Sequence, residues 1–317
     1  MFWLWLYVAA FLVWLTFRVV WFDAHWFLAL LDDNALFGFA PLPFLLAYAL
    51  WQREYALTLA LLIPCLAFIK MYGARFWPRR QARRPRAAFR VTSFNMHYQN
   101  WDHDAFVRAL ETAQPDLVGL QEVSAANRAL IETRLAKQFP YRIYQPIVET
   151  HAVALLSRYP LDEIEFLTPT VERGLRATAH LPDGALTVLV VHLAPPNMLT
   201  YPLAEFTTLA RARFETRRAE TAMLRALGVA TPAPAVLLGD CNLSDTSKTY
   251  QTLASTWRDS FRERGWGLGL TLKIFLPFPL LRYDYIWHNA ALGAADFHIG
   301  ADGGSDHLPV SAALYFA

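Results

Sequence analysis

Three long stretches without a charged residue lie at the start of this 317-residue chain. They are Phe2–Phe17, Ala35–Trp51 and Tyr55–Ile69, and the first continues beyond a single Arg18 as far as Phe22. A membrane-spanning helix needs roughly 20 mostly apolar residues, so the first two are long enough, and the third is short unless Lys70 snorkels to an interface. The pattern predicts about three transmembrane helices within residues 1–72, with Ala24–Leu31 as an interfacial helical turn.

A hairpin of core helices is the alternative to membrane spans. We disfavour it because the sequence downstream offers no matching apolar surface, and because only 18% of the whole chain is charged, against about 25% in an ordinary soluble domain. A cleaved signal peptide would begin with a basic region, and Met1–Tyr7 has none.

A basic segment follows the apolar stretches. Lys70 to Arg90 contains eight Lys and Arg residues and no acid, and its Pro- and Arg-rich part predicts an extended linker over residues 73–87. Because Lys and Arg gather on the cytoplasmic side of membrane helices, this cluster predicts a multi-pass cell-membrane protein whose C-terminal part is cytoplasmic. The same segment could instead bind anionic lipid head groups.

Residues 88–317 have the length and pattern of one α/β domain. Apolar segments predict strands at Ala88–Met96, Asp116–Gln121, Val153–Ser157, Ala185–Leu193, Ala235–Leu238, Tyr283–His288 and Leu308–Phe316. Helices are predicted from Asp102 through Thr112, from Ser124 to about Gln138, and over Tyr201–Leu227. The two cysteines, Cys65 and Cys241, exclude a disulfide framework and a cysteine-based zinc site.

Polar residues stand at the ends of six of these apolar segments. They occur in Ser93-Phe94-Asn95, Gln121-Glu122, Val191-His192-Leu193, Gly239-Asp240-Cys241-Asn242, Arg282-Tyr283-Asp284 and Ser305-Asp306-His307. One such residue is usually a satisfied core group or a helix cap, but a carboxylate beside a strand is costly to bury unless it is paired or metal-bound. Six of them predict one shared site.

The chemistry of these side chains indicates a phosphate site. Glu122, Asp306 and the amide of Asn95 are hard oxygen ligands suited to Mg²⁺ or Mn²⁺. His192 and His307 can donate hydrogen bonds to phosphate oxygens. Asp240 can act as a general base for water, and Asn242 can orient that water.

The order and spacing of the six motifs resemble the endonuclease/exonuclease/phosphatase (DNase I-like) superfamily, from about Ala88 to the C-terminus. The resemblance implies a four-layer α/β sandwich, two β-sheets flanked by helices, with the site at one sheet edge. It also implies a division of roles, in which Asn95, Glu122 and Asp306 hold the divalent metal, Asp240 with Asn242 aligns or deprotonates the attacking water, His307 paired with Asp284 contacts the scissile phosphate, and His192 binds phosphate or assists the leaving oxygen. The implied reaction is hydrolysis of a phosphoester or phosphoanhydride.

One position departs from the family's pattern. His151 stands where many members have a glycine, and nearby Glu149 is either a partner of a site histidine or an ordinary loop acid. Arg173 and Arg176 either reach the substrate phosphate or lie on the surface.

The substrate is predicted from charge and hydrophobicity. Residues 87–317 carry 20 basic and 23 acidic residues, and binding to nucleic acid usually needs a basic surface. The predicted loops Ala194–Phe206 and Leu268–Leu281 each hold one charged residue. They either pack on the core or membrane helices, or bind an amphiphile.

The leading hypothesis is a membrane-anchored, metal-dependent phosphohydrolase acting on a lipid or lipid-linked phosphate. The alternatives are a membrane-tethered nuclease or soluble phosphodiesterase, with Lys70–Arg90 gathering the polyanion, and a non-catalytic membrane scaffold.

Overall fold

The computed structural model describes residues 1–77, 88–100, 102–146, 152–196, 202 and 204–317. Most of the predicted linker, and the positions of Glu149 and His151, lie outside these ranges.

The N-terminal region is entirely helical. It contains α1 (Phe2–Val20), α2 (Trp26–Asp33), α3 (Ala35–Phe39), α4 (Leu42–Trp51), α5 (Tyr55–Tyr72) and a short 3₁₀ turn (Gly73–Phe76). Two helices are long and apolar enough to cross a membrane, Phe2–Val20 and Tyr55–Phe76. A third crossing would need α2 and the helices after it to act as one span despite a bend of 59°.

The second uncharged stretch does not form one continuous helix. It divides into α3 and α4 on either side of Ala40 and Pro41, and Pro41 occupies the N-cap of α4. Proline lacks a backbone N–H and clashes with the preceding turn, which explains the break. The interfacial turn predicted at Ala24–Leu31 is a helix, α2, which begins at Trp26 and ends at Asp33.

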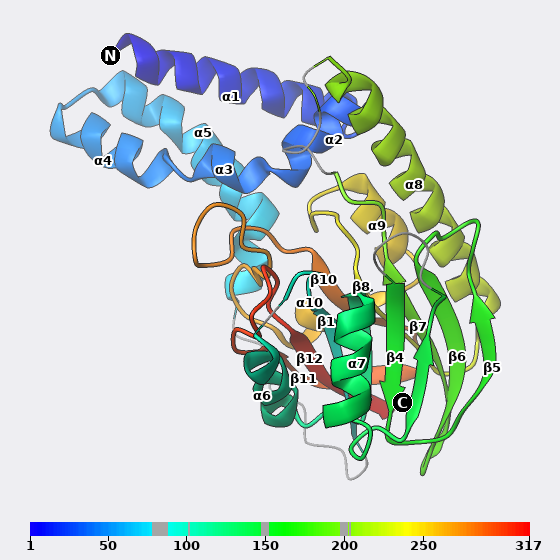
Figure 1. Cartoon of the computed structure of the whole chain (residues 1–317). Helices are drawn as coiled ribbons and strands as arrows, with labels where there is room; N and C mark the ends of the chain where they lie inside the picture. The colour runs from blue at the N-terminus through cyan, green and yellow to red at the C-terminus, as the bar shows by residue number, and fades with distance from the viewer. Residues whose placement is uncertain (78–87, 101, 147–151, 197–201, 203) are drawn as a thin grey trace.

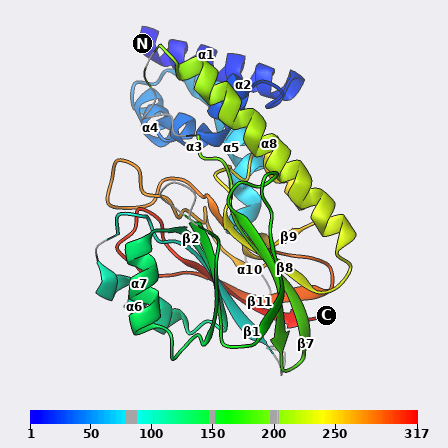
Figure 2. The same cartoon turned by 45° about the vertical axis from the view of Figure 1, so that its right-hand side comes forward.

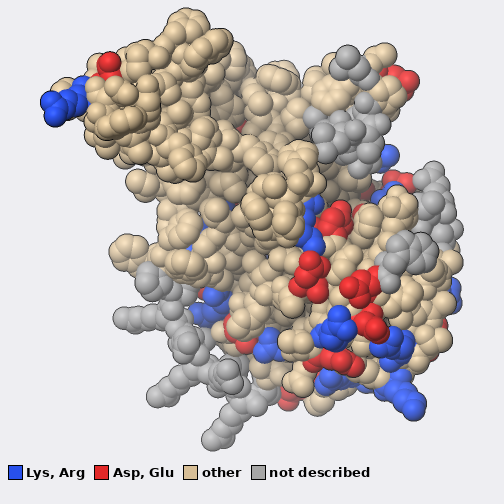
Figure 3. Space-filling model, turned by 60° about the vertical axis from the view of Figure 1, so that its left-hand side comes forward, with Lys and Arg blue, Asp and Glu red and all other residues tan. Residues whose placement is uncertain are grey.

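These helices expose an apolar surface. Trp3 is 75% exposed and Trp51 is 77% exposed, and other large apolar side chains of α1, α4 and α5 are also exposed. The face in Figure 3 carries few charged side chains over this region, whereas Lys, Arg, Asp and Glu gather over the remainder. Contiguous apolar surface of this kind marks an interaction with membrane or protein.

The remaining chain forms two six-stranded sheets that pack face to face (Figure 1). The strands of the first sheet, in spatial order, are β11 (Leu292–Ile299), β12 (Val310–Phe316), β1 (Phe89–Asn95), β2 (Leu117–Val123), β4 (Ala152–Ser157) and β3 (Tyr141–Tyr144). Those of the second are β5 (Leu161–Phe166), β6 (Gly174–Leu181), β7 (Gly184–His192), β8 (Ala235–Asp240), β10 (Asp284–His288) and β9 (Arg258–Asp259). Only β1 with β2 and β7 with β8 pair in parallel among the described strands.

Helices cover the outer face of each sheet, which confirms the predicted four-layer α/β sandwich. The first sheet packs against α6 (His103–Ala113) and α7 (Ala125–Arg134), and the second against α8 (Phe206–Ala230) and α9 (Lys248–Ala254). A short α10 (Ser260–Arg264) lies beside β10 and β11. Figure 2 shows that α8 extends from the sheets to the apolar helices, where it contacts α2.

Candidate active site

Strand pairing brings the predicted polar residues together at one edge of the sandwich. In the second sheet, His192 of β7 and Asp284 of β10 pair on either side of Asp240, the last residue of β8. In the first sheet, Asn95 at the end of β1 pairs with the residue before Glu122. Neighbouring strands lie about 4.8 Å apart, so each sheet delivers a group of adjacent side chains.

Asn95 joins the two sheets. Its Nδ2 donates to Oε1 of Glu122 at 3.1 Å and to Oδ2 of Asp240 at 3.0 Å. Glu122 Oε2 accepts from the backbone N–H of Tyr98. Burial opposes ionisation of Glu122, but nearby His192 and the bond from Asn95 prevail and hold its pKa well below the usual range. Glu122 is therefore a carboxylate at neutral pH.

His307 and Asp284 form a buried pair. Nδ1 of His307 lies 2.8 Å from Oδ2 of Asp284, which leaves Nε2 directed toward Asp240 at 3.6 Å. Burial disfavours the imidazolium, but Asp284 and Asp240 outweigh it and raise the pKa of His307 to about 10. His307 is therefore a cation that offers a proton donor to the cleft.

Asp240 is placed to accept a proton. Its Oδ2 lies 3.6 Å from Nε2 of His192, and its Oδ1 accepts from the backbone N–H of Asn242. Burial raises its pKa, and the charge of His307 only partly opposes this. A carboxyl group with a raised pKa is a stronger base, as proton abstraction near neutral pH requires.

Two site residues hold a left-handed backbone conformation, Glu122 with φ of 58° and Asn242 with φ of 50°. Such values are uncommon for residues other than glycine and occur where the surrounding structure enforces them. The side chain of Asn242 is fixed as well, because its Nδ2 donates to the carbonyl of Leu193.

The donor set of the cleft suits a hard divalent cation. Glu122, Asp240 and Asp306 all line it, and Asp306 is exposed there. Among the described residues, Asp240, Asp284 and His307 each place one possible ligand atom within 4.8 Å of the others, but the charged imidazole of His307 already neutralises that group. Oδ1 of Asp284 is buried without a hydrogen-bond partner, which a cation or a water would satisfy. Asn95 now turns Nδ2 toward the carboxylates while its Oδ1 accepts from His97, so ligation by its oxygen needs an amide flip.

The cleft also has apolar walls, and its volume is about 650 Å³. Its polar part contains Asp240, His192 and His307, and its apolar part contains Leu30 and Phe37 of the N-terminal helices. The predicted apolar loop Leu268–Leu281 adds further apolar side chains to the wall, namely Leu272, Ile274, Phe275 and Leu281.

The structure separates the two arginines that the sequence left open. Arg173 lines the cleft, and its Nη1 lies 3.5 Å from Nδ1 of His192. Arg176 instead lies 3.7 Å from Glu165 on the neighbouring strand and does not line the cleft.

Comparison with known families decides the assignment of the fold. Residues 92–307 match the model of the Endonuclease/Exonuclease/phosphatase family. The chain belongs to this family. The match runs from the first strand to His307, so it covers all six motifs identified in the sequence.

Solved structures support the same fold for this family member. An endonuclease/exonuclease/phosphatase from Beutenbergia cavernae superposes with a TM-score of 0.56 at 19% identity, over 73% of this chain and 72% of that one. The human Nocturnin catalytic domain with bound sulfate gives 0.56 at 18% identity, over 73% and 95%. Truncated Caenorhabditis elegans TDP2 gives 0.55 at 16% identity, over 73% and 98%. No curated protein matches the sequence.

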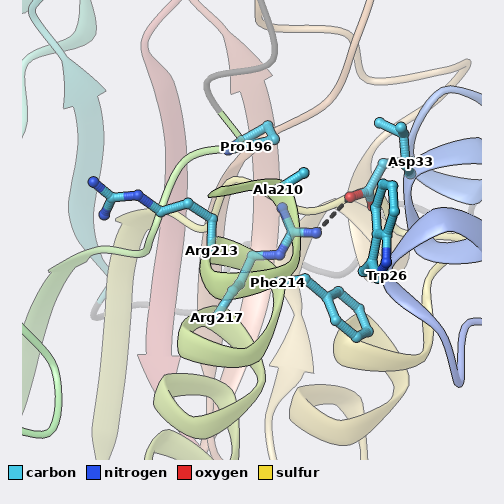
Figure 4. A pocket seen from close by; sticks show the side chains of 8 residues that line it. Trp26, Asp33, Pro196, Ala210, Arg213, Phe214 and Arg217 are labelled. Atoms are coloured by element: carbon cyan, nitrogen blue, oxygen red, sulfur yellow. Dashed lines mark hydrogen bonds and ion pairs between the residues drawn. The ribbon is translucent and has the colours of Figure 1, made fainter. Parts of the chain in front are cut away.

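Sequence reasoning missed a set of contacts between the N-terminal helices and the loop that follows β8. Asp33 of α2 accepts from Arg217 Nη2 at 2.6 Å (Figure 4). It also accepts from the backbone N–H of Ser244 at 3.1 Å. Arg217 Nη1 in turn donates to the backbone carbonyl of Asn242. The sequence signal for these contacts was Asp33 itself, an acid in the mostly apolar N-terminal region, because ionisable residues in such a region are usually functional.

Proposed function

We propose that this protein is a membrane-anchored, divalent-metal-dependent hydrolase that cleaves a phosphoester or phosphoanhydride of a lipid or lipid-linked phosphate. The observation that carries the proposal is the composition of the cleft. Asp240 and His307 lie in the same 650 Å³ space as Leu30 and Phe37, which come from the helices predicted to contact membrane. A phosphate group with a hydrocarbon tail matches both halves.

Glu122 and Asp306, with Asn95 after an amide flip, would hold Mg²⁺ or Mn²⁺. The cation would supply charge that stabilises the phosphoryl oxygens in the transition state. The carboxylates of Glu122 and Asp306, which both line the cleft, support a cation here.

The side chains then divide the proton chemistry. Asp240 accepts the proton of the attacking water, and Asn242 orients that water from the loop after β8. His307 donates from Nε2 to a phosphate oxygen while Asp284 fixes its ring, which is the electrostatic stabilisation that phosphoryl transfer needs. His192, whose Nε2 lies 3.6 Å from Oδ2 of Asp240, donates a hydrogen bond to the leaving oxygen.

We propose a cellular location and a domain division as well. Two helices suitable for crossing a membrane, the apolar surface around them and the basic segment Lys70–Arg90 support a multi-pass cell-membrane protein. The proposed division is a transmembrane region over 1–72, a linker over 73–87 and a catalytic domain over 88–317, and the positive charge of the basic segment supports a cytoplasmic position for that domain.

A second candidate is a nuclease. Danio rerio TDP2 complexed with a single-strand DNA product superposes with a TM-score of 0.55 at 16% identity, over 72% of this chain and 99% of that one. The net negative charge of residues 87–317 argues against it, because phosphate neutralisation supplies much of the affinity for nucleic acid.

The test is an activity screen of the full-length protein in detergent with Mg²⁺ or Mn²⁺, against lipid phosphates, nucleotides, DNA and RNA. We expect hydrolysis of a lipid phosphate and a loss of roughly 10²–10⁴-fold in kcat for Asp240→Asn and His307→Ala. Asp183→Asn, at an exposed acid in a turn, is the matched control and should retain wild-type activity.

Cleavage of nucleic acid without cleavage of any lipid phosphate would establish the nuclease instead. A protein that hydrolyses nothing and binds no divalent cation by calorimetry would be the non-catalytic membrane scaffold.

A further inference from the structure

A second hollow lies between α1 and the α2–α3 segment. It has a volume of about 400 Å³ and is lined by Tyr7, Ala10, Phe11, Trp14, Phe37 and Gly38, among others. We call it the helix groove. At Gly38 a Cβ atom would meet no atom within 4 Å, so the groove is open at its floor rather than filled by side chains.

The helix groove adjoins the catalytic cleft. Asn34 and Phe37 line both spaces, one polar and one aromatic side chain at the junction. The cleft that contains Asp240 and His307 and the groove between the N-terminal helices therefore meet at these two side chains. The two volumes, about 650 and 400 Å³, each fall within the range of about 300–1,000 Å³ typical of ligand sites.

We propose that the helix groove binds the hydrocarbon chain of the substrate whose phosphate is hydrolysed at Asp240 and His307. This rests on the proposed function and adds the place where the chain is held. The occupant is the substrate's own chain because the groove joins the cleft, which brings the polar end of an occupant to the catalytic residues.

The arrangement also explains how an apolar substrate reaches a polar site. The groove is walled by α1, one of the two helices suited to crossing a membrane. A lipid that enters there keeps its chain in apolar surroundings throughout. Each methylene that the groove removes from water contributes about a fourfold gain in binding.

The test compares substrates that differ only in chain length. The full-length protein, held in amphipol without free detergent micelles, is given alkyl monophosphates and p-nitrophenyl alkyl phosphodiesters with ethyl, hexyl or dodecyl chains below their critical micelle concentrations, and kcat/KM is measured for each. For the wild type we expect kcat/KM to rise by about fourfold per methylene until the groove is filled. The readout for variants is the ratio of dodecyl to ethyl kcat/KM, which cancels differences in the folded fraction.

Adjacent residues of α1 provide a matched pair of variants. Ala10 lines the helix groove, whereas Ala9 is exposed and does not line it. Ala10→Leu and Gly38→Leu fill the groove and should lower the dodecyl-to-ethyl ratio by about tenfold or more, since two or more methylenes of the chain are displaced. Ala9→Leu adds the same carbons outside and should keep the wild-type ratio.

The outcomes separate the two proposals. A wild-type ratio in all three variants, or wild-type kcat/KM independent of chain length, overturns the helix groove but leaves lipid-phosphate hydrolysis standing. Hydrolysis of the ethyl esters or of nucleic acid alone, with no long-chain phosphate cleaved, overturns both. A ratio that falls equally in Ala9→Leu assigns the effect to general disturbance of α1 and overturns the groove.

Discussion

Replacing Asp33 by alanine should both destabilise the protein and slow hydrolysis. The carboxylate lies on α2, yet its partners are Arg217 of α8 and the backbone of Ser244 after β8. Without it, Arg217 keeps a buried charge and loses its carboxylate partner, and the loop that carries Asn242 loses the hydrogen bond from the backbone of Ser244.

The magnitude follows from burial. The side chains of Arg217 and Asp33 are only 5% and 3% exposed, and removing one partner of such a pair costs about 3–5 kcal/mol. One kcal/mol corresponds to about 2 °C in the unfolding midpoint of a chain this large, so the expected shift is about 6–10 °C downward. Displacement of Asn242 should lower kcat by about tenfold or more, because catalysis depends steeply on position.

The assay is thermal unfolding of the full-length protein in detergent, together with kcat on the substrate that the screen identifies. Asp183→Ala removes an exposed acid and should change neither measurement. Asp33→Leu combined with Arg217→Met replaces the pair by apolar side chains and should restore most of the stability. It should not restore kcat, because methionine donates nothing to the carbonyl of Asn242.

An Asp33→Ala protein that unfolds within about 1 °C of the wild type would refute this reasoning, since it would mean that Arg217 finds equal stabilisation without Asp33.

Three further predictions concern stability. Burial raises the pKa of Glu220 to about 7, so the folded state holds a proton that the unfolded chain releases above about pH 4.5. The free energy of unfolding should therefore fall by up to about 3 kcal/mol as pH rises from about 4.5 to about 7. Glu220→Gln should make the unfolding midpoint less dependent on pH between about pH 5 and pH 8, and an unchanged dependence would contradict the assignment. Gly239→Ala should lower the free energy of unfolding by about 1–3 kcal/mol in chemical unfolding, because a Cβ there would lie 2.6 Å from the backbone oxygen of Val191. The control is Gly38→Ala, whose Cβ meets no atom within 4 Å and should be tolerated. Equal stability of the two variants would count against this packing. Mg²⁺ or Mn²⁺ at about 100 times its Kd should raise stability by about 2.7 kcal/mol, and Glu122→Gln should abolish the effect, while a shift that persists in Glu122→Gln would place the cation elsewhere.

The sequence was most informative where local chemistry determines structure. Asp102 and Ser124 cap α6 and α7 as predicted, each accepting from a backbone N–H three residues on. Most of the strands that were predicted are continuous apolar runs. The largely buried β6 was missed because its apolar residues alternate with polar ones, and the edge strand Leu161–Phe166 was missed because three of its six residues are charged. α7 ends at Arg134, several residues before the proline expected to stop it.

The site could be predicted from its strand ends, but its electrostatics could not. Pairing of Asp240 with His192 and with Asp284 is a consequence of strand order, which the motifs allow but do not specify. The contact between Asp33 and Arg217 joins residues 184 positions apart, and no local pattern encodes such a distance. Pro41 could have predicted the division of one uncharged stretch into α3 and α4, but a prediction based on hydrophobicity alone does not detect it.

The salt bridge between Arg75 and Asp245 has a consequence for how such a protein can be modified. Arg75 ends the helical region and is 2% exposed, and its Nη2 donates to Oδ1 of Asp245 at 2.7 Å, while Arg282 donates to the other oxygen at 3.1 Å. The sandwich thus has a buried carboxylate, Asp245, that pairs with an arginine from the N-terminal helical region. An unrelated membrane anchor joined at residue 88 would hold the enzyme at a bilayer but would not supply Arg75, so Asp245 would keep only partners from the sandwich, such as Arg282. The helices and the sandwich are therefore expected to work best when they are exchanged together.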